Sequence, residues 1–375
     1  MNILSLFDQQ QVAALGSRVW APSSIGALIE PYSADHLLSA NTPAVVLLSV
    51  GEPDLIIQKV REYLYELFLP RENFSVADLG HLNASPEDLA EILARLISYG
   101  SFPVIIAPDQ SLTVYQYQAY CRLERTVNLI SVDDRPDLDD GTSLLGENNW
   151  LSHLLAISPN YLFNYSLIGH QNYLSNPDIL RSLEQLHFDI HRLGLVRQSE
   201  ESTEPFFRNA DFLSFDISAV RAADSPQNLR AGPNGLYAEE ACRLIRYSGM
   251  SNKLSSAGIY GWLSSGHDFN PLSASLIAQL TWHLLDGFFN RIEEGVPGNA
   301  EDFTIYKVSS GAAESDLLFY KSNRSGRWWM YVPMNNSNKN RFRKHQIVPC
   351  SYADYQQALK GDVPETWWQT FQKML

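Results

Sequence analysis

Apolar runs of strand length alternate with stretches of helical periodicity along the first 300 residues of the chain. Val45–Val50 and Val127–Val132 are runs of the kind that is buried on both faces of a parallel sheet. Ile57–Leu69 carries apolar residues at helical spacing, and Ser85, followed by Pro86 and two acids, is a typical helix start. This alternation predicts a three-layer, doubly wound, mainly parallel α/β fold.

The pattern continues and then changes character after about residue 300. Further strands are expected at 76–79, 104–107, 159–166, 212–217 and 255–262, and further helices at 112–120, 177–185, 236–247 (capped by Gly249) and 273–289. Beyond these, antiparallel strands are expected at 303–308, 317–320 and 328–332, and helices at 352–359 and 365–375. We therefore divide the chain into an N-terminal lead-in (1–43), an α/β domain (44–300) and a small C-terminal α+β appendage (301–375).

Polar clusters follow three of the expected strands. They read Ala107-Pro108-Asp109-Gln110-Ser111, Asp133-Asp134-Arg135-Pro136-Asp137 and Ser214-Phe215-Asp216-Ile217-Ser218. In parallel α/β sheets, ligands collect beyond the carboxyl ends of the strands. The three clusters are therefore the candidate functional residues.

These three clusters resemble the motifs of the ureohydrolase family, which includes arginase, agmatinase and formimidoylglutamase. The family's corresponding strand ends read Gly-Gly-Asp-His-Ser, Asp-Ala-His-x-Asp and Ser-x-Asp-x-Asp. The resemblance covers roughly residues 45–287 and implies an arginase-like fold. It also implies metal-dependent hydrolysis of linear amidines, with four aspartates and two histidines holding two manganese ions.

Half of the six metal-ligand positions differ from the family pattern. The positions that the resemblance implies are Gln110, Asp133, Arg135, Asp137, Asp216 and Ser218. A guanidinium has no free lone pair and cannot bind a metal, and serine is a poor ligand. One interpretation is that Arg135 replaces the metal as counter-ion of the three aspartates in an internal ion-pair cluster. The alternative is a single manganese or magnesium ion, held by Gln110, Asp133, Asp137 and Asp216.

The substrate side of the implied site is also altered. Near the last strand of the α/β domain, some family members carry a glutamate that recognises the cationic group of the substrate. Gly261 or Trp262 occupies that position here, and neither offers a carboxylate. His153 lies roughly where arginases carry a proton-shuttling histidine, although the register does not match, and a structural place on a loop or helix surface is the alternative.

From these changes we expect a protein that has lost the binuclear manganese site and acts as a non-catalytic binding, regulatory or assembly protein, without a bound cofactor. The alternative is a formimidoylglutamase-like amidine hydrolase that uses a single hard metal ion. The resemblance also implies a homo-oligomer. The appendage is a possible surface for an unknown protein partner.

Composition and charge restrict the remaining classes. The net charge of −14 makes nucleic acid an unlikely partner, and no run of eighteen apolar residues predicts a membrane span. The first residues do not resemble a signal peptide, so we expect a cytoplasmic protein. The three cysteines, Cys121, Cys242 and Cys350, are odd in number and far apart, which argues against a disulfide framework.

The appendage differs in charge from the rest of the chain. Residues 301–375 hold 10 Lys and Arg against 7 Asp and Glu, a net charge of +3. Its basic residues Arg324, Arg327, Lys339, Arg341, Arg343 and Lys344 surround tryptophans, and Trp367 and Trp368 follow. This pattern suits a nucleic acid or an acidic protein surface. It equally suits a small aromatic core whose basic face docks against the acidic domain, which is the interpretation we favour.

Two histidine pairs complete the candidates. His187 and His191 have the spacing of metal ligands on one helix face, but no nearby acid completes a known motif, so we expect structural roles. His267 and Asp268 follow the last strand of the α/β domain, and Asp268 matches an aspartate common in the family, where it is expected to support loop structure.

Overall fold

The computed structural model of the chain describes residues 3–31, 43–51, 54–69, 75–139, 143–263, 269–295, 297, 299, 301–309, 316–334 and 342–375. His267 and Asp268 lie outside the described residues. No helix of the described part of the chain is long and apolar enough to cross a membrane.

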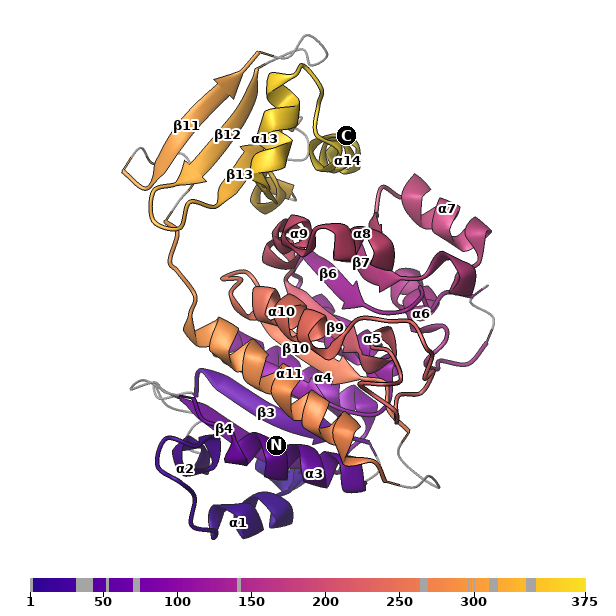
Figure 1. Cartoon of the computed structure of the whole chain (residues 1–375), viewed down its shortest axis with the longest axis vertical. Coiled ribbons are helices and arrows are strands. Elements are labelled where there is room, and N and C mark those ends of the chain that lie inside the picture. The colour runs from indigo at the N-terminus through magenta and orange to yellow at the C-terminus, as the bar shows by residue number, and fades with distance from the viewer. Residues whose placement is uncertain are drawn as a thin grey trace.

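A ten-stranded sheet forms the centre of the larger body (Figure 1). The strands run in the order β1-β4-β3-β5-β10-β9-β6-β7-β8, with β2 also paired to β4. All pairings are parallel except that of β1 with β4. The strands are β1 Phe7–Asp8, β2 Glu30–Pro31, β3 Val45–Val50, β4 Val76–Leu82, β5 Phe102–Ile106, β6 Val127–Val132, β7 Leu162–His170, β8 Asp189–Arg192, β9 Phe212–Asp216 and β10 Ser256–Tyr260.

Helices cover both faces of this sheet, as the doubly wound prediction requires (Figure 1). One layer contains α3, α10 and α11, which pack on one another, and the other contains α4, α5 and α6. The helices of the larger body are α1 Gln10–Gly16, α2 Ile25–Leu28, α3 Leu55–Glu66, α4 Pro86–Ser98, α5 Thr113–Arg122, α6 Trp150–Ala156, α7 Pro177–Gln185, α8 Leu193–Gln198, α9 Glu204–Asn209, α10 Ala238–Gly249 and α11 Pro271–Phe289. The predicted fold class is therefore confirmed.

Local chemistry explains why these elements form where they do. Every residue of β3 and of β6 is buried, as expected for central strands covered on both faces. The helix start at Ser85 is a capping box, because the Ser85 hydroxyl accepts from the Asp88 amide while the Asp88 carboxylate accepts from the Ser85 amide. Pro86 occupies the first helical position, where its missing N–H costs nothing.

Some local signals differ from the structure. His187 and His191 have the spacing of one helix face but do not share one, because His187 lies in a turn at φ 58° and His191 is on strand β8. The strand predicted at 159–166 runs instead from Leu162 to His170, and Gly249 is the last residue of α10 rather than its cap. In each case long-range sheet pairing or helix packing overrides a local signal.

The C-terminal appendage is a separate four-stranded antiparallel sheet covered by two helices (Figure 1). Its elements are β11 Phe303–Val308, β12 Leu317–Ser322, β13 Trp328–Tyr331, β14 Ile347–Cys350, α13 Tyr352–Leu359 and α14 Glu365–Met374. Strand β14 was not predicted. Trp328, Trp329 and Trp367 are buried, whereas Trp368 is exposed, so most of the aromatic residues form the predicted small core.

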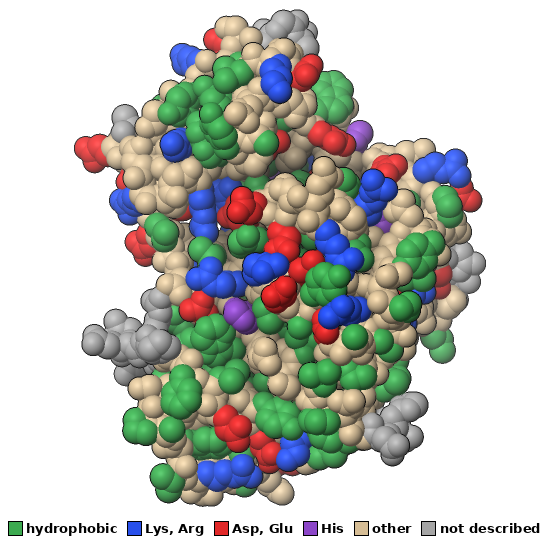
Figure 2. Space-filling model, viewed as in Figure 1, with side chains coloured by type: hydrophobic (Ala, Val, Ile, Leu, Met, Phe, Trp, Pro, Cys, Tyr) green, Lys and Arg blue, Asp and Glu red, His purple; other side chains and the backbone are tan. Residues whose placement is uncertain are grey.

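The appendage packs against α9, the start of β7 and the turn before β6. The Arg208 guanidinium on α9 donates to the carbonyl oxygens of Trp328 and Cys350 and stacks on the Trp329 ring. Arg327 of the appendage lies within 3.4 Å of Glu204, and Figure 2 shows mixed acidic and basic side chains along this junction. Part of the basic face therefore docks on acidic residues, as we favoured.

All three cysteines, Cys121, Cys242 and Cys350, are free thiols.

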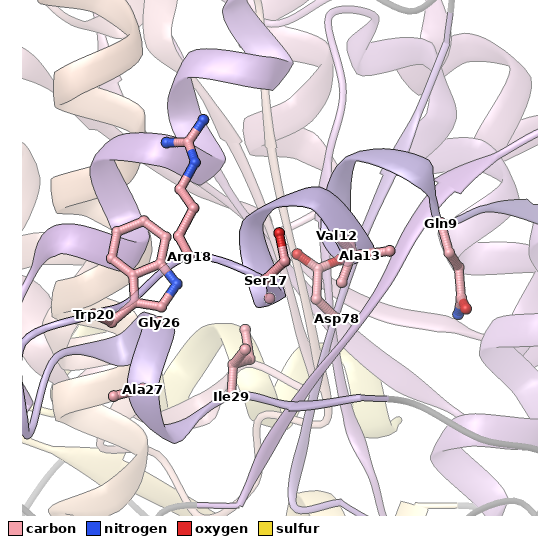
Figure 3. Close-up of a pocket in the computed structure, with 11 residues that line it drawn as sticks. Gln9, Val12, Ala13, Ser17, Arg18, Trp20, Gly26, Ala27, Ile29 and Asp78 are labelled. Carbon is pink, nitrogen blue, oxygen red and sulfur yellow. The ribbon is translucent and has the colours of Figure 1, made fainter.

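The N-terminal segment packs beside β4 and encloses a cavity of about 620 Å³ between α1, α2 and that strand. Figure 3 shows the Arg18 side chain directed away from Asp78, whose carboxylate lines this cavity. Two guanidinium nitrogens of Arg61 bind the Asp78 carboxylate at 2.9 and 3.1 Å. The charge of Asp78 is therefore neutralised within the fold.

Candidate functional site

The three predicted polar clusters converge at one edge of the sheet. Strands β5, β10, β9 and β6 are consecutive neighbours and parallel, so their carboxyl ends lie side by side. Asp133 and Asp137 follow β6, Asp216 ends β9, and Gln110 follows β5. All four side chains are buried. The ends of these strands therefore bring together the positions that the sequence singled out.

Arg230 is the cation of this cluster. Its Nη2 atom lies 3.0 Å from Asp133 Oδ1, its Nη1 atom 3.0 Å from Asp137 Oδ1, and its Nη2 atom 3.5 Å from Asp216 Oδ2. Its Nε atom is 3.4 Å from Asp134 Oδ1. Only 12% of the Arg230 side chain is exposed. One guanidinium therefore neutralises carboxylates from two different strand ends, and it does so in a water-poor environment where the attraction is strong.

The backbone around Arg230 holds it in place. Arg230 belongs to the Pro-, Gly- and Asn-rich segment between β9 and α10. The Leu229 amide donates to the Gly261 carbonyl oxygen at 3.0 Å, which ties the segment to the end of β10. The Asn228 side chain donates to the Val220 carbonyl oxygen at 3.0 Å. The residues before Arg230 are thus anchored to the segments that follow β9 and β10.

Arg135 does not have the role that the sequence suggested. Its Nε and Nη2 atoms donate to the two carboxylate oxygens of the adjacent Asp134 at 2.9 and 3.1 Å, and 30% of its side chain is exposed. It forms no ion pair with Asp133, Asp137 or Asp216 among the described contacts. A guanidinium does contact the carboxylates of Asp133, Asp137 and Asp216, but it belongs to Arg230 and not to Arg135.

Burial perturbs the acids of the cluster strongly. Burial, followed by repulsion from Asp137 and Asp216, raises the pKa of Asp133 well above its usual value. Burial also raises the pKa of Asp216, and it raises that of Asp137 to about 6, although Arg230 opposes both shifts. Burial alone would lower the pKa of Arg230, but Asp133, Asp216 and Asp137 outweigh it and raise that pKa. The Arg230 guanidinium therefore stays charged, whereas the raised pKa values of the three carboxyl groups favour their protonated forms.

Glu147 adds a further acid above this cluster. Burial and the charges of Asp109 and Asp216 raise its pKa to about 7. Its neighbour Asn148 accepts a hydrogen bond from Arg230 Nη1 at 3.2 Å, and Trp150 donates to Asp137 Oδ2 at 3.1 Å. The segment from Glu147 to the start of α6 thus contacts both Arg230 and Asp137.

The side chains at the implied metal positions do not fit two metal ions. Arg230 nitrogen atoms contact carboxylate oxygens of Asp133, Asp137 and Asp216, three of the expected ligands, at 3.0 to 3.5 Å. Ser218 Oγ accepts from Arg230 at 3.1 Å, and no group of three or more His, Cys, Asp or Glu side chains in the described residues could hold a metal. The donor set is arranged around the Arg230 guanidinium.

Two buried oxygens of the cluster have no hydrogen-bond partner within the described structure: Gln110 Oε1 and Asp133 Oδ2. The Gln110 amide nitrogen donates to Ser214 Oγ at 3.2 Å, which fixes the direction of the side chain. These oxygens are acceptors that remain available to a proton, a water molecule or a cation.

Gly261 belongs to the site, and Trp262 does not. A Cβ atom on Gly261 would lie 2.0 Å from Asp216 Oδ1, and the residue has φ +95°, which favours glycine. The Trp262 ring is buried away from the cluster and donates to Asp54 Oδ2 at 2.9 Å. A side chain at position 261 would displace the Asp216 carboxylate.

Replacing Gly261 with alanine is expected to lower the free energy of unfolding by about 2 kcal/mol more than the same change at Gly100. Both glycines have positive φ and share the cost of left-handed strain, about 1 kcal/mol. Gly100 has no atom within 4 Å of the added Cβ, so the difference isolates the clash with Asp216. Urea unfolding of both variants measures it, and equal losses would contradict this placement of Gly261.

His153 lies on α6, partly exposed, and its Nε2 atom contacts the Ser143 carbonyl oxygen at 3.0 Å. No described contact links it to the carboxylates. The structural alternative for His153 therefore agrees better with its position than a proton-shuttling role does.

Sequence reasoning missed Arg230, Glu147 and Asn148. All three lie in loops, and Arg230 contacts Asp133 across 97 residues of sequence. The available signal was an arginine after the β9 cluster, in a segment rich in turn-forming residues.

No protein-family model matches the chain, and no curated protein sequence matches it. Solved structures do match. A formiminoglutamase of Trypanosoma cruzi, with manganese bound, is 17% identical at a TM-score of 0.60, covering 68% of this chain and 96% of that one. The formimidoylglutamase of Bacillus subtilis is 16% identical at a TM-score of 0.63, covering 74% of this chain and 96% of that one. An agmatine ureohydrolase of Thermoplasma volcanium is 15% identical at a TM-score of 0.54, covering 72% and 96%.

These structures establish that the chain has the fold of the arginase superfamily. At such low identity, the likeness extends to the fold alone, because one fold supports many functions. The function has to be argued from the site.

Proposed function

We propose that this protein has the ureohydrolase fold but is a non-catalytic binding protein, with a regulatory or assembly role, in which the Arg230 guanidinium replaces the metal ions. The observation that carries the proposal is the contact of one guanidinium with the carboxylates of Asp133, Asp137 and Asp216. A guanidinium carries a fixed charge that meets carboxylates with directed hydrogen bonds, but it cannot activate water as a bound metal can.

The remaining positions support the same proposal. Gln110, Arg135 and Ser218 stand where the family resemblance implies two histidines and an aspartate. Gly261 offers no carboxylate for a cationic substrate, and the close approach of Asp216 leaves no space for one there.

A single-metal amidine hydrolase is the second candidate. The unpartnered oxygens Gln110 Oε1 and Asp133 Oδ2 favour it, because both belong to the predicted set of hard-metal ligands. Arg230 opposes it, since metal binding at that set requires the guanidinium to move away.

An activity assay separates the two candidates. The full chain is incubated with excess manganese and then with formiminoglutamate, agmatine or arginine, and a formiminoglutamase of known structure serves as the positive control. We expect no product above the protein-free blank for any substrate. Manganese-dependent release of product that disappears in Asp133→Asn would support the single-metal hydrolase and overturn the proposal.

A further inference from the structure

A pocket of about 960 Å³ lies at the opposite edge of the sheet from the Arg230 cluster, where the larger body meets the appendage. One wall comes from the turn after α5, which holds Glu124 and Arg125, and another from the segment before β7. Arg343 and Lys344, in the short 3₁₀ helix before β14, form the appendage side. Two parts of the chain that are distant in sequence thus build one pocket, the arrangement in which ligand sites commonly occur.

Most of the charged side chains that line this pocket are basic. Arg125, Arg343 and Lys344 face a single acid among the lining residues, Glu124. Neither guanidinium forms an ion pair or side-chain hydrogen bond with any described residue, and the Lys344 ammonium donates to the Thr126 carbonyl oxygen. The whole chain has a net charge of −14, so a positive pocket is not an average property of its surface.

Other arginines of the appendage are neutralised within the fold. Arg324 pairs with Asp302 at 2.7 Å, and Arg327 lies within 3.4 Å of Glu204 and 3.6 Å of Glu294. These contacts belong to the charged junction described above. They account for part of the basic composition of the appendage, but no described residue pairs with the Arg343 guanidinium.

The backbone and the buried surroundings of the pocket are also unusual. Glu124 adopts φ +51° at the end of α5, a position where glycine is preferred, and this conformation directs the chain so that Arg125 lines the pocket. Next to Lys344, the His345 ring is buried and stacks on Phe163 at 3.9 Å, and both of its ring nitrogens lack a partner among the described residues. Burial and the charges of Lys253, Lys344 and Lys373 lower the pKa of His345.

We propose that this pocket binds a small molecule bearing a phosphate group, with the phosphate oxygens on Arg125, Arg343 and Lys344. A phosphate presents several acceptor oxygens and up to two negative charges, so it can satisfy donors that reach it from two elements, whereas one carboxylate fills a single guanidinium fork. Glu124 would accept a hydrogen bond from a hydroxyl or amine elsewhere in the same ligand. The proposal does not depend on the function proposed for the Arg230 cluster.

Isothermal titration of the full chain with pyrophosphate at low ionic strength tests this site. We expect a dissociation constant below about 1 mM and a loss of at least about tenfold in affinity in each of Arg125→Ala and Arg343→Ala. Arg192→Ala is the matched control, because it removes the same charge from an exposed arginine at the end of β8, and its affinity should equal that of the wild type. Thermal unfolding verifies that all variants fold.

Three results would overturn the proposal. The first is no heat of binding at millimolar pyrophosphate. The second is an equal loss in all three variants, which would mean attraction by overall charge. The third is tighter binding of citrate than of pyrophosphate, which would identify a site for carboxylates instead.

Discussion

Replacing Arg230 with alanine is expected to lower the free energy of unfolding by about 3–5 kcal/mol. The variant leaves Asp133, Asp137 and Asp216 buried at one sheet edge without the cation that contacts all three. Their pKa values are already raised by burial and mutual repulsion, so loss of Arg230 forces them to take up protons or to separate. Urea unfolding monitored by tryptophan fluorescence measures the loss.

Arg135→Ala is the matched control for this experiment. Arg135 is partly exposed, and the described residue with which it pairs is Asp134, so its loss should cost no more than about 1 kcal/mol. A cost for Arg135→Ala equal to or greater than that for Arg230→Ala would contradict our assignment of the central cation. It would return Arg135 to the role that the sequence suggested.

Manganese affinity should be restored only when Arg230 is removed together with the changed ligands. The triple variant Gln110→His, Arg135→His and Ser218→Asp supplies the missing family ligands but retains the guanidinium among them. We expect this triple variant to bind manganese weakly. Adding Arg230→Ala should strengthen binding by roughly a hundredfold or more, because the carboxylates of Asp133, Asp137 and Asp216 then face the metal rather than the guanidinium.

Titration of both variants with manganese, with free Mn²⁺ followed by electron paramagnetic resonance, measures this difference. Equal, tight binding by the triple and quadruple variants would show that Arg230 does not compete for the site. Failure of both folded variants to bind would show that the three changed positions do not correspond to the family's metal ligands.

The fold was predictable because its central strands are locally unambiguous. Val45–Val50 and Val127–Val132 are predicted and observed with the same bounds, since a fully buried parallel strand needs a continuous apolar run. The capping box at Ser85 is equally local. Strand β14 was not predicted, because Ile347–Cys350 is a short run that contains a proline and pairs at the edge of its sheet.

Only those residues of the candidate site that lie at strand ends could be predicted from the sequence. Asp133, Asp137 and Asp216 follow strand ends, so the sheet order alone brings them together. Arg230 reaches them from a loop whose course depends on the amide contact of Leu229 with Gly261, and no local pattern encodes that contact. From the sequence, the arginine nearest to the three carboxylates is Arg135, but the arginine that contacts them in space is Arg230.

If the Arg230 guanidinium takes the place of metal ions at the carboxyl ends of β5, β6 and β9, the wild-type protein should not retain manganese. For elemental analysis, the protein is purified without chelator, incubated with excess manganese and freed of unbound ions by gel filtration. We expect no retained metal above the buffer background. One or two retained equivalents of manganese that are lost in Asp133→Asn would show that the guanidinium does not replace the metal.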